Sequence, residues 1–143
     1  MESYEKPATS AATVREYVQK MACAACLQRG LRPIVALNET DFRAVQAAKA
    51  ACALTICGRN DAEMSANIRK ATRALKGKYT HLLLNFIIKE ETSIARLHEW
   101  LQPFDGMQWT FGCCTDRSSG ICCRAELIAY RPDEPRTTPP RQP

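Results

Sequence analysis

One nearly continuous apolar run, residues 82–88, constrains the fold of this chain more than any other feature. Only Asn85 interrupts it, so the run is apolar at both odd and even positions. A strand with one face in water alternates apolar and polar residues, whereas a strand covered on both faces does not. We therefore predict a central parallel strand over residues 80–88, with helices packed on both faces of its sheet.

Helical and strand patterns alternate on either side of this run. Helices are predicted over about residues 10–29, from about 41, over 63–76 and from 94 to shortly before Pro103. The other predicted strands cover residues 52–57, 107–114 and 121–130. The last two are expected to form a hairpin around a turn at residues 116–120. The crossover from the first strand to the central one is expected to be right-handed.

These elements predict one α/β domain, an α/β/α sandwich around a small mixed sheet, over residues 11–130. Residues 1–10 are polar and are expected to be flexible, and five prolines in residues 131–143 predict a disordered tail. The chain has no run of 18 apolar residues, and its polar start is unlike an export signal. We therefore expect a cytoplasmic protein without a membrane partner.

The eight cysteines are expected to be free thiols, because disulfides belong to exported chains. Six of them form a C-x-x-C motif within the first predicted helix and two CC pairs near the C-terminus: Cys23 and Cys26, Cys113 and Cys114, Cys122 and Cys123. Adjacent strand residues point to opposite faces, so each CC pair offers one sulfur to a given site. Structural zinc needs four ligands. We expect buried apolar thiols and no metal or cofactor, with zinc binding and a reactive thiol as alternatives.

The sequence predicts no catalytic residue. Its two histidines, His81 and His98, lie outside any triad-like arrangement. Both glycine-rich phosphate-binding motifs are absent, and Glu90 and Glu91 fall in a polar loop. We expect neither enzymatic activity nor a small-molecule substrate.

A cluster of cations is the strongest functional signal in a chain of net charge +5. Five cations and no acid lie within residues 69–78, and like charges one helical turn apart destabilise an isolated helix. A polyanionic partner explains such a cluster, and a solvated helix face is the alternative. The predicted RNA-binding residues are Arg32, Arg43, Lys49, Arg69, Lys70, Arg73, Lys76 and Lys78.

Three segments carry a resemblance to a known family. Residues 42–61 join a helix to a cysteine-containing strand that ends in a polar Asn-Asp loop, residues 97–101 read Leu-His-Glu-Trp-Leu, and residues 120–130 place two cysteines and an apolar run between a glycine and a tyrosine. Together they resemble the kink-turn-binding ribosomal proteins, and among these the eukaryotic-type small-subunit ribosomal protein twelve family. The chain departs from that pattern in two places. Asn38 and Glu39 stand without the family's RNA-contacting glycine, and residues 104–110 form an insert.

The resemblance implies a structural constituent of the small ribosomal subunit that binds ribosomal RNA without catalysis. Its implied partners are ribosomal RNA and neighbouring ribosomal proteins. RNA in such particles is recognised by shape and by phosphate contacts. The alternatives are a protein–protein adaptor of the same fold and a small thiol or zinc protein.

Overall fold

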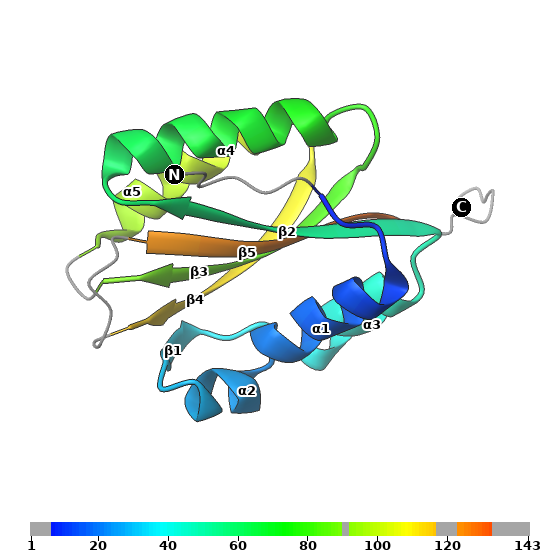
Figure 1. The fold of residues 1–143 in the computed structure, drawn as a ribbon, viewed down its shortest axis with the longest axis horizontal. Coiled ribbons are helices and arrows are strands. Elements are labelled where there is room, and N and C mark those ends of the chain that lie inside the picture. The colour runs from blue at the N-terminus through cyan, green and yellow to red at the C-terminus, as the bar shows by residue number, and fades with distance from the viewer. Residues whose placement is uncertain (1–6, 90–91, 117–122, 133–143) are drawn as a thin grey trace, which may run out of the picture.

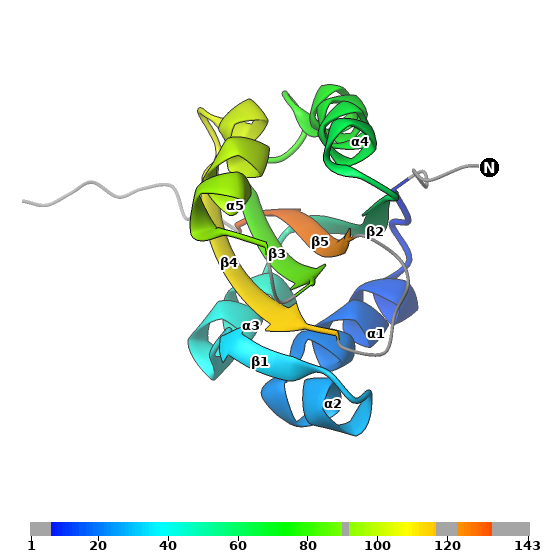
Figure 2. The ribbon, with the colours of Figure 1, turned by 90° about the vertical axis from the view of Figure 1, so that its left-hand side faces the viewer.

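The computed structural model describes residues 7–89, 92–116 and 123–132. The helices are α1 (Ala11–Met21), α2 (Cys23–Gln28), α3 (Glu39–Gln46), α4 (Asp61–Leu75) and α5 (Ile94–Leu101), followed by a 3-10 turn η1 (Gln102–Phe104). The strands are β1 (Arg32–Val35), β2 (Ala50–Gly58), β3 (His81–Ile88), β4 (Gln108–Thr115) and β5 (Cys123–Arg131). Helices α4 and α5 cover one face of the sheet, and α1, α2 and α3 cover the other (Figures 1 and 2). The predicted single-domain α/β/α sandwich is confirmed.

Strand β3 lies at the centre of a five-stranded mixed sheet with the order β1-β4-β3-β5-β2. It pairs in parallel with β4 and antiparallel with β5. Its last seven residues are buried, as the apolar run predicted. The central position of this strand is therefore confirmed.

The predicted C-terminal hairpin is wrong. Strands β4 and β5 do not pair with each other, because β3 lies between them. Strand β5 is buried along almost its whole length and needs a hydrogen-bonded neighbour on each side, which β3 and β2 supply. Of the predicted turn, Asp116 is described, and residues 117–120 lie outside the described residues, as do residues 133–143 of the predicted tail.

The long N-terminal helix predicted over residues 10–29 is two helices. The chain adopts an extended conformation at Ala22, with ψ 144°, and this residue separates α1 from α2. The segment around Pro33, for which no helix or strand was predicted, contains the short strand β1, which pairs with β4 and has a bulge between Pro33 and Val35. Proline fits this position because an edge strand leaves one row of N–H positions without a ladder partner. Ala8, within the N-terminal segment expected to be flexible, exchanges two backbone hydrogen bonds of 2.9 Å with Ala53.

Side-chain caps set the start of the principal helices. The Ser10, Asn38, Asn60 and Ser93 side chains each accept a hydrogen bond from the backbone N–H three residues on. Asn38 and Asp41 form a reciprocal capping box. The second predicted helix consequently begins at Glu39, two residues before the position expected for it.

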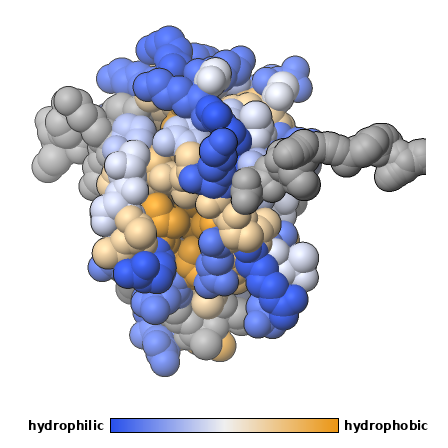
Figure 3. Space-filling model, turned by 90° about the vertical axis from the view of Figure 1, so that its right-hand side faces the viewer, coloured by the Kyte–Doolittle hydropathy of each residue, from blue (hydrophilic) through white to orange (hydrophobic). Residues whose placement is uncertain are grey.

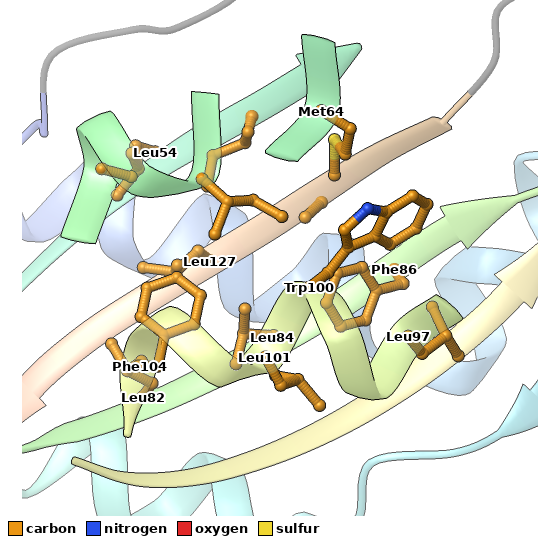
Figure 4. Close-up of a cluster of buried hydrophobic side chains, with 14 of the residues drawn as sticks. Leu54, Met64, Leu82, Leu84, Phe86, Leu97, Trp100, Leu101, Phe104 and Leu127 are labelled. Carbon is orange, nitrogen blue, oxygen red and sulfur yellow. The ribbon is translucent and has the colours of Figure 1, made fainter. Parts of the chain in front are cut away.

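The larger hydrophobic core lies between the sheet and the α4–α5 layer (Figure 4). Trp100, Phe86 and Phe104 are its largest side chains, and Trp100 is 2% exposed. The opposite face holds a smaller core beneath α1 and α3 and a third cluster beneath α2. Trp100 therefore packs on the sheet and is not exposed to a partner.

Candidate nucleic-acid interface

Helix α4 carries the predicted cations on its outer face. Its residues Met64, Ile68, Ala71 and Leu75, which recur at helical spacing, are buried against the sheet. The cations that follow the other face are all exposed. We refer to these residues as the α4 cation row: Arg69, Lys70, Arg73, Lys76 and Lys78.

The acids of α4 lie at its opposite end and are already paired. Asp61 accepts a salt bridge of 3.1 Å from Arg96, and Glu63 accepts one of 3.0 Å from Arg59. Hydrogen bonds from the Arg59 side chain and backbone lower the pKa of Glu63 below its ordinary value. Within the described part of the chain, no member of the α4 cation row forms an ion pair. The row therefore has no intramolecular countercharge there.

Two segments distant in the sequence bring further cations to the end of the sheet where Lys78 lies. The backbone N–H of Lys49 donates to the carbonyl oxygen of Arg131 at 2.9 Å. The Arg131 guanidinium in turn donates to the carbonyl oxygen of Lys78 at 2.8 Å. The start of β2, the end of β5 and the loop after α4 therefore meet there (Figure 1). The backbone of Lys49, one of the predicted cations, therefore lies at the same end of the sheet as Lys78, the last member of the α4 cation row.

Arg131 belongs to this surface although the sequence analysis did not select it. It lies within the segment expected to be a disordered tail, but it is the last residue of β5 and pairs with Ala50. The only available signal was the continuation of the strand by one residue beyond Tyr130. A sequence pattern does not show that position 131 faces position 78.

Two predicted RNA-binding residues lie elsewhere. Arg32 is exposed on β1, the edge strand farthest from β2. Arg43 is on α3, on the sheet face opposite α4, and forms a salt bridge of 3.7 Å with Glu39. These two cations do not join the surface formed by the α4 cation row and Lys49.

Asn38 and Glu39, at the start of α3, have a structural role. The Asn38 side chain accepts the N–H of Asp41 at 3.1 Å, and the Asp41 carboxylate accepts the N–H of Asn38 at 2.9 Å. Glu39 faces Arg43. The side-chain oxygen of Asn38 is therefore engaged in the helix cap.

A buried polar network separates Arg29 from the other cations. The Arg29 guanidinium donates two hydrogen bonds to Glu126, at 2.7 and 3.3 Å, and Asn85 donates to the same carboxylate at 3.4 Å. The hydrogen bond to Glu126 raises the pKa of Arg29, against the opposing effect of burial. This arginine holds the α2 region on the sheet and is not available to a polyanion.

Cys26, Cys52, Cys113 and Cys114 are free, buried thiols, as predicted; Cys123 is also buried, and Cys57 is half-buried. Neighbouring Cys113 and Cys114 face opposite sides of the sheet, in separate clusters, as strand geometry requires. The Cys114 thiol lies 3.3 Å from that of Cys26. Burial, reinforced by this contact, raises the pKa of Cys114 to about 12.

A thiolate is the nucleophilic form of cysteine, so a thiol with so high a pKa is poorly suited to catalysis. No group of three or more His, Cys, Asp or Glu side chains in the described ranges is arranged to hold a metal ion. Cys23 and Cys122, which completed the two cysteine motifs, lie outside the residues whose side chains are described.

No family model matches this sequence, and no curated protein matches it significantly. None of the helices in the described residues is both long enough and apolar enough to cross a bilayer.

Proposed function

We propose that this chain is a non-catalytic RNA-binding protein that contacts RNA phosphates through the α4 cation row, Lys49 and Arg131. The observation that carries the proposal is the set of exposed cations without an ion-pair partner in the described residues. In its specific form, which follows from the family resemblance, the proposal is a structural constituent of the small ribosomal subunit in the cytoplasm. Ribosomal RNA and adjacent ribosomal proteins are then its partners.

The dimensions of the row suit a polynucleotide. At about 1.5 Å per residue, the stretch from Arg69 to Lys76 is about 10 Å long. One strand of a duplex places a phosphate about every 3.4 Å along its axis, so the row can contact two or three phosphates of one strand. Such contacts position a protein on RNA by charge and shape without reading its sequence.

A favourable interaction with the helix dipole is the competing explanation for cations at the end of α4. That interaction contributes about 0.3–1 kcal/mol per charge and fades within the last turn. It covers Arg73 and Lys76, but Arg69 and Lys70 lie farther back and Lys49 and Arg131 belong to other elements. An anionic partner accounts for all of these positions together.

Paired substitutions test the proposal at constant net charge. Arg69→Gln/Arg73→Gln removes two positive charges from the α4 cation row. Arg32→Gln/Arg43→Gln removes two positive charges from β1 and α3, outside the row. Binding to small-subunit RNA, measured over a salt series, is expected to show a log–log slope reduced by about 1.5 in the first pair and unchanged in the second. Equal slopes for both pairs would exclude the row as the contact.

Sedimentation tests the specific form. The wild-type protein is expected to sediment with small ribosomal subunits and to be released from them by high salt, whereas the Arg69→Gln/Arg73→Gln protein is expected to be released at lower salt. A protein that binds RNA by the slope test but never sediments with subunits retains the general proposal and loses the ribosomal one.

An adaptor function is the second candidate, favoured by one observation. Leu27, Ile34 and Val35 are exposed apolar residues on α2 and β1, at the edge of the sheet. Exposed edge strands with apolar side chains are typical sites of strand addition by another chain. If the adaptor function is correct, Ile34→Lys impairs partner binding, and the Arg69→Gln/Arg73→Gln protein retains it.

A further inference from the structure

An open cleft lies between α1, the end of α3 and the start of β2. Its volume is about 570 Å³, and Tyr79, from the loop before β3, lines it together with residues of α1 and β2. Figure 3 shows this end of the molecule, with an apolar hollow surrounded by hydrophilic side chains. Pockets of about 300–1,000 Å³ are the usual size for small-molecule ligands.

The lining of the cleft is apolar at its base. Val14 and Val45 are buried, Val18 and Ala48 are half-buried, and all four belong to or pack against the core beneath α1 and α3. Because these side chains come from two helices anchored on the same sheet, the base is formed by the fold and does not depend on a ligand. An apolar group placed there would lose contact with water on several sides.

The charged side chains that line the cleft are all cations. Arg15 and Lys49 are both exposed, come from α1 and from the start of β2, and are the charged members of its twelve lining residues; none of the twelve is acidic. Neither cation forms an ion pair within the described part of the chain. Tyr79 is the aromatic member of the lining. The cleft therefore combines an apolar base with two cations in its lining.

We propose that this cleft binds a small amphipathic carboxylate, an organic acid whose apolar body of medium chain length lies on the valines and whose carboxylate lies between Arg15 and Lys49. Two cations without an acidic neighbour favour an anion over a neutral ligand, and charge-assisted hydrogen bonds are the strongest that a carboxylate makes. The volume suits a small molecule, and the apolar base suits its hydrocarbon portion. This site is separate from the outer face of α4 and does not depend on RNA binding, although Lys49 borders both surfaces.

Calorimetric titration of the full chain with decanoate tests the proposal. Saturable binding at one site is expected, and the neutral ester methyl decanoate is expected to bind at least about tenfold more weakly, since a hydrogen bond to a charged group is worth about 1.5–3 kcal/mol. Arg15→Gln/Lys49→Gln is expected to weaken decanoate binding by a similar factor or more. Arg43→Gln, an exposed cation on α3 outside the cleft, is the matched control and is expected to bind decanoate normally.

Filling the cleft gives an independent test. Val18→Phe places a larger side chain at the half-buried base and is expected to abolish decanoate binding while the unfolding midpoint stays near that of the wild type. Ala48→Phe serves the same purpose if Val18→Phe does not fold. Absence of decanoate binding to the wild type, or binding unaffected by both the charge changes and the filling changes, overturns the proposal. Normal decanoate binding by the Arg69→Gln/Arg73→Gln protein separates this result from the test of RNA binding.

Discussion

The two faces of the sheet are built differently. Among the described residues, the face beneath α4 and α5 has one continuous core of twenty buried residues, whereas the face beneath α1, α2 and α3 has two clusters, of nine and four. Between those two clusters lie the polar groups of Arg29, Asn85 and Glu126, and the open cleft borders the larger of them. The continuous core holds α4 as a rigid support for its outer cations. The divided face has less apolar packing, because a polar network and an open cleft occupy part of it.

The largest expected effect is on the continuous core. Trp100 is 2% exposed and packs on Phe86, with ring centroids 6.0 Å apart. Removing a buried aromatic side chain leaves a cavity that the surroundings fill only partly, so Trp100→Ala is expected to lower the free energy of unfolding by about 3–5 kcal/mol. Urea unfolding measures this loss.

Trp100→Phe is the control. The indole Nε1 of Trp100 is buried without a hydrogen-bond partner among the described residues, so phenylalanine keeps much of the packing and removes an unsatisfied donor. It is expected to cost clearly less than alanine. A loss below about 1 kcal/mol for Trp100→Ala would mean that this face is not the continuous core described here.

Alanine substitutions of two adjacent leucines of β3 compare the contributions of the two faces to stability. Leu84 lies in the continuous core and Leu83 in the cluster beneath α1 and α3, and both are at most 1% exposed. Alanine at either position is expected to cost about 2–5 kcal/mol, with Leu84→Ala worse by about 1 kcal/mol, because the side that borders an open cleft can relax into the lost volume. Paired urea unfolding curves measure the difference, and a greater cost for Leu83→Ala would reverse the comparison.

The sequence predicted the continuous face better than the divided one. The apolar run of β3 and the helical stripe of α4 predicted the central strand and the face that α4 buries, since burial on both sides and a 3.6-residue period leave direct traces in a sequence. The break at Ala22 and the four-residue strand β1 left no periodic trace. Patterns of this kind describe one segment at a time.

Strand pairing and the candidate sites depend on which segments meet. Tertiary contacts determine that β3 lies between β4 and β5, and no local sequence pattern encodes these contacts. The hairpin prediction was wrong for that reason. The cations of α4 were visible as a cluster in the sequence. The proximity of Lys49, Lys78 and Arg131 was not, because it depends on hydrogen bonds between residues far apart in the chain.

The polar network of the divided face is expected to have an intermediate effect. Glu126 is 2% exposed and Arg29 side-chain exposure is 28%, so Glu126→Gln leaves an arginine partly buried without its countercharge. Loss of one partner from a fully buried pair costs about 3–5 kcal/mol, and the partial exposure of Arg29 reduces the expected loss to about 2–3 kcal/mol. Glu99→Gln, which breaks the exposed pair with Arg96, is the control and is expected to cost less than about 1 kcal/mol. Equal losses in the two variants would show that water reaches the network.

The smallest expected effect concerns alkaline stability and again compares neighbours on opposite faces. Burial, the hydrogen bond with Cys26 and the proximity of that thiol raise the pKa of Cys114 from an ordinary value of 9.0 to about 12. A group whose pKa is raised on folding stabilises the fold in its protonated form. The contribution of Cys114 is therefore complete below pH 9 and is lost as the pH rises from 9 toward 12.

Cys114→Ala removes this dependence, so the midpoint of urea unfolding is expected to fall less between pH 8.5 and 10.5 than it does in the wild type, by a difference of about a few tenths of a molar. Cys113→Ala removes the same number of atoms from the continuous face. Burial raises the pKa of Cys113 as well, but a hydrogen bond from the backbone of Val35 favours its thiolate, so its removal is expected to flatten the pH profile less. Tyr79, whose pKa is raised to about 12 chiefly by burial, is present in both variants and cancels in the comparison. If the urea midpoint falls equally steeply with pH in the two variants, the Cys26–Cys114 contact does not make the divided face more sensitive to high pH than the continuous face.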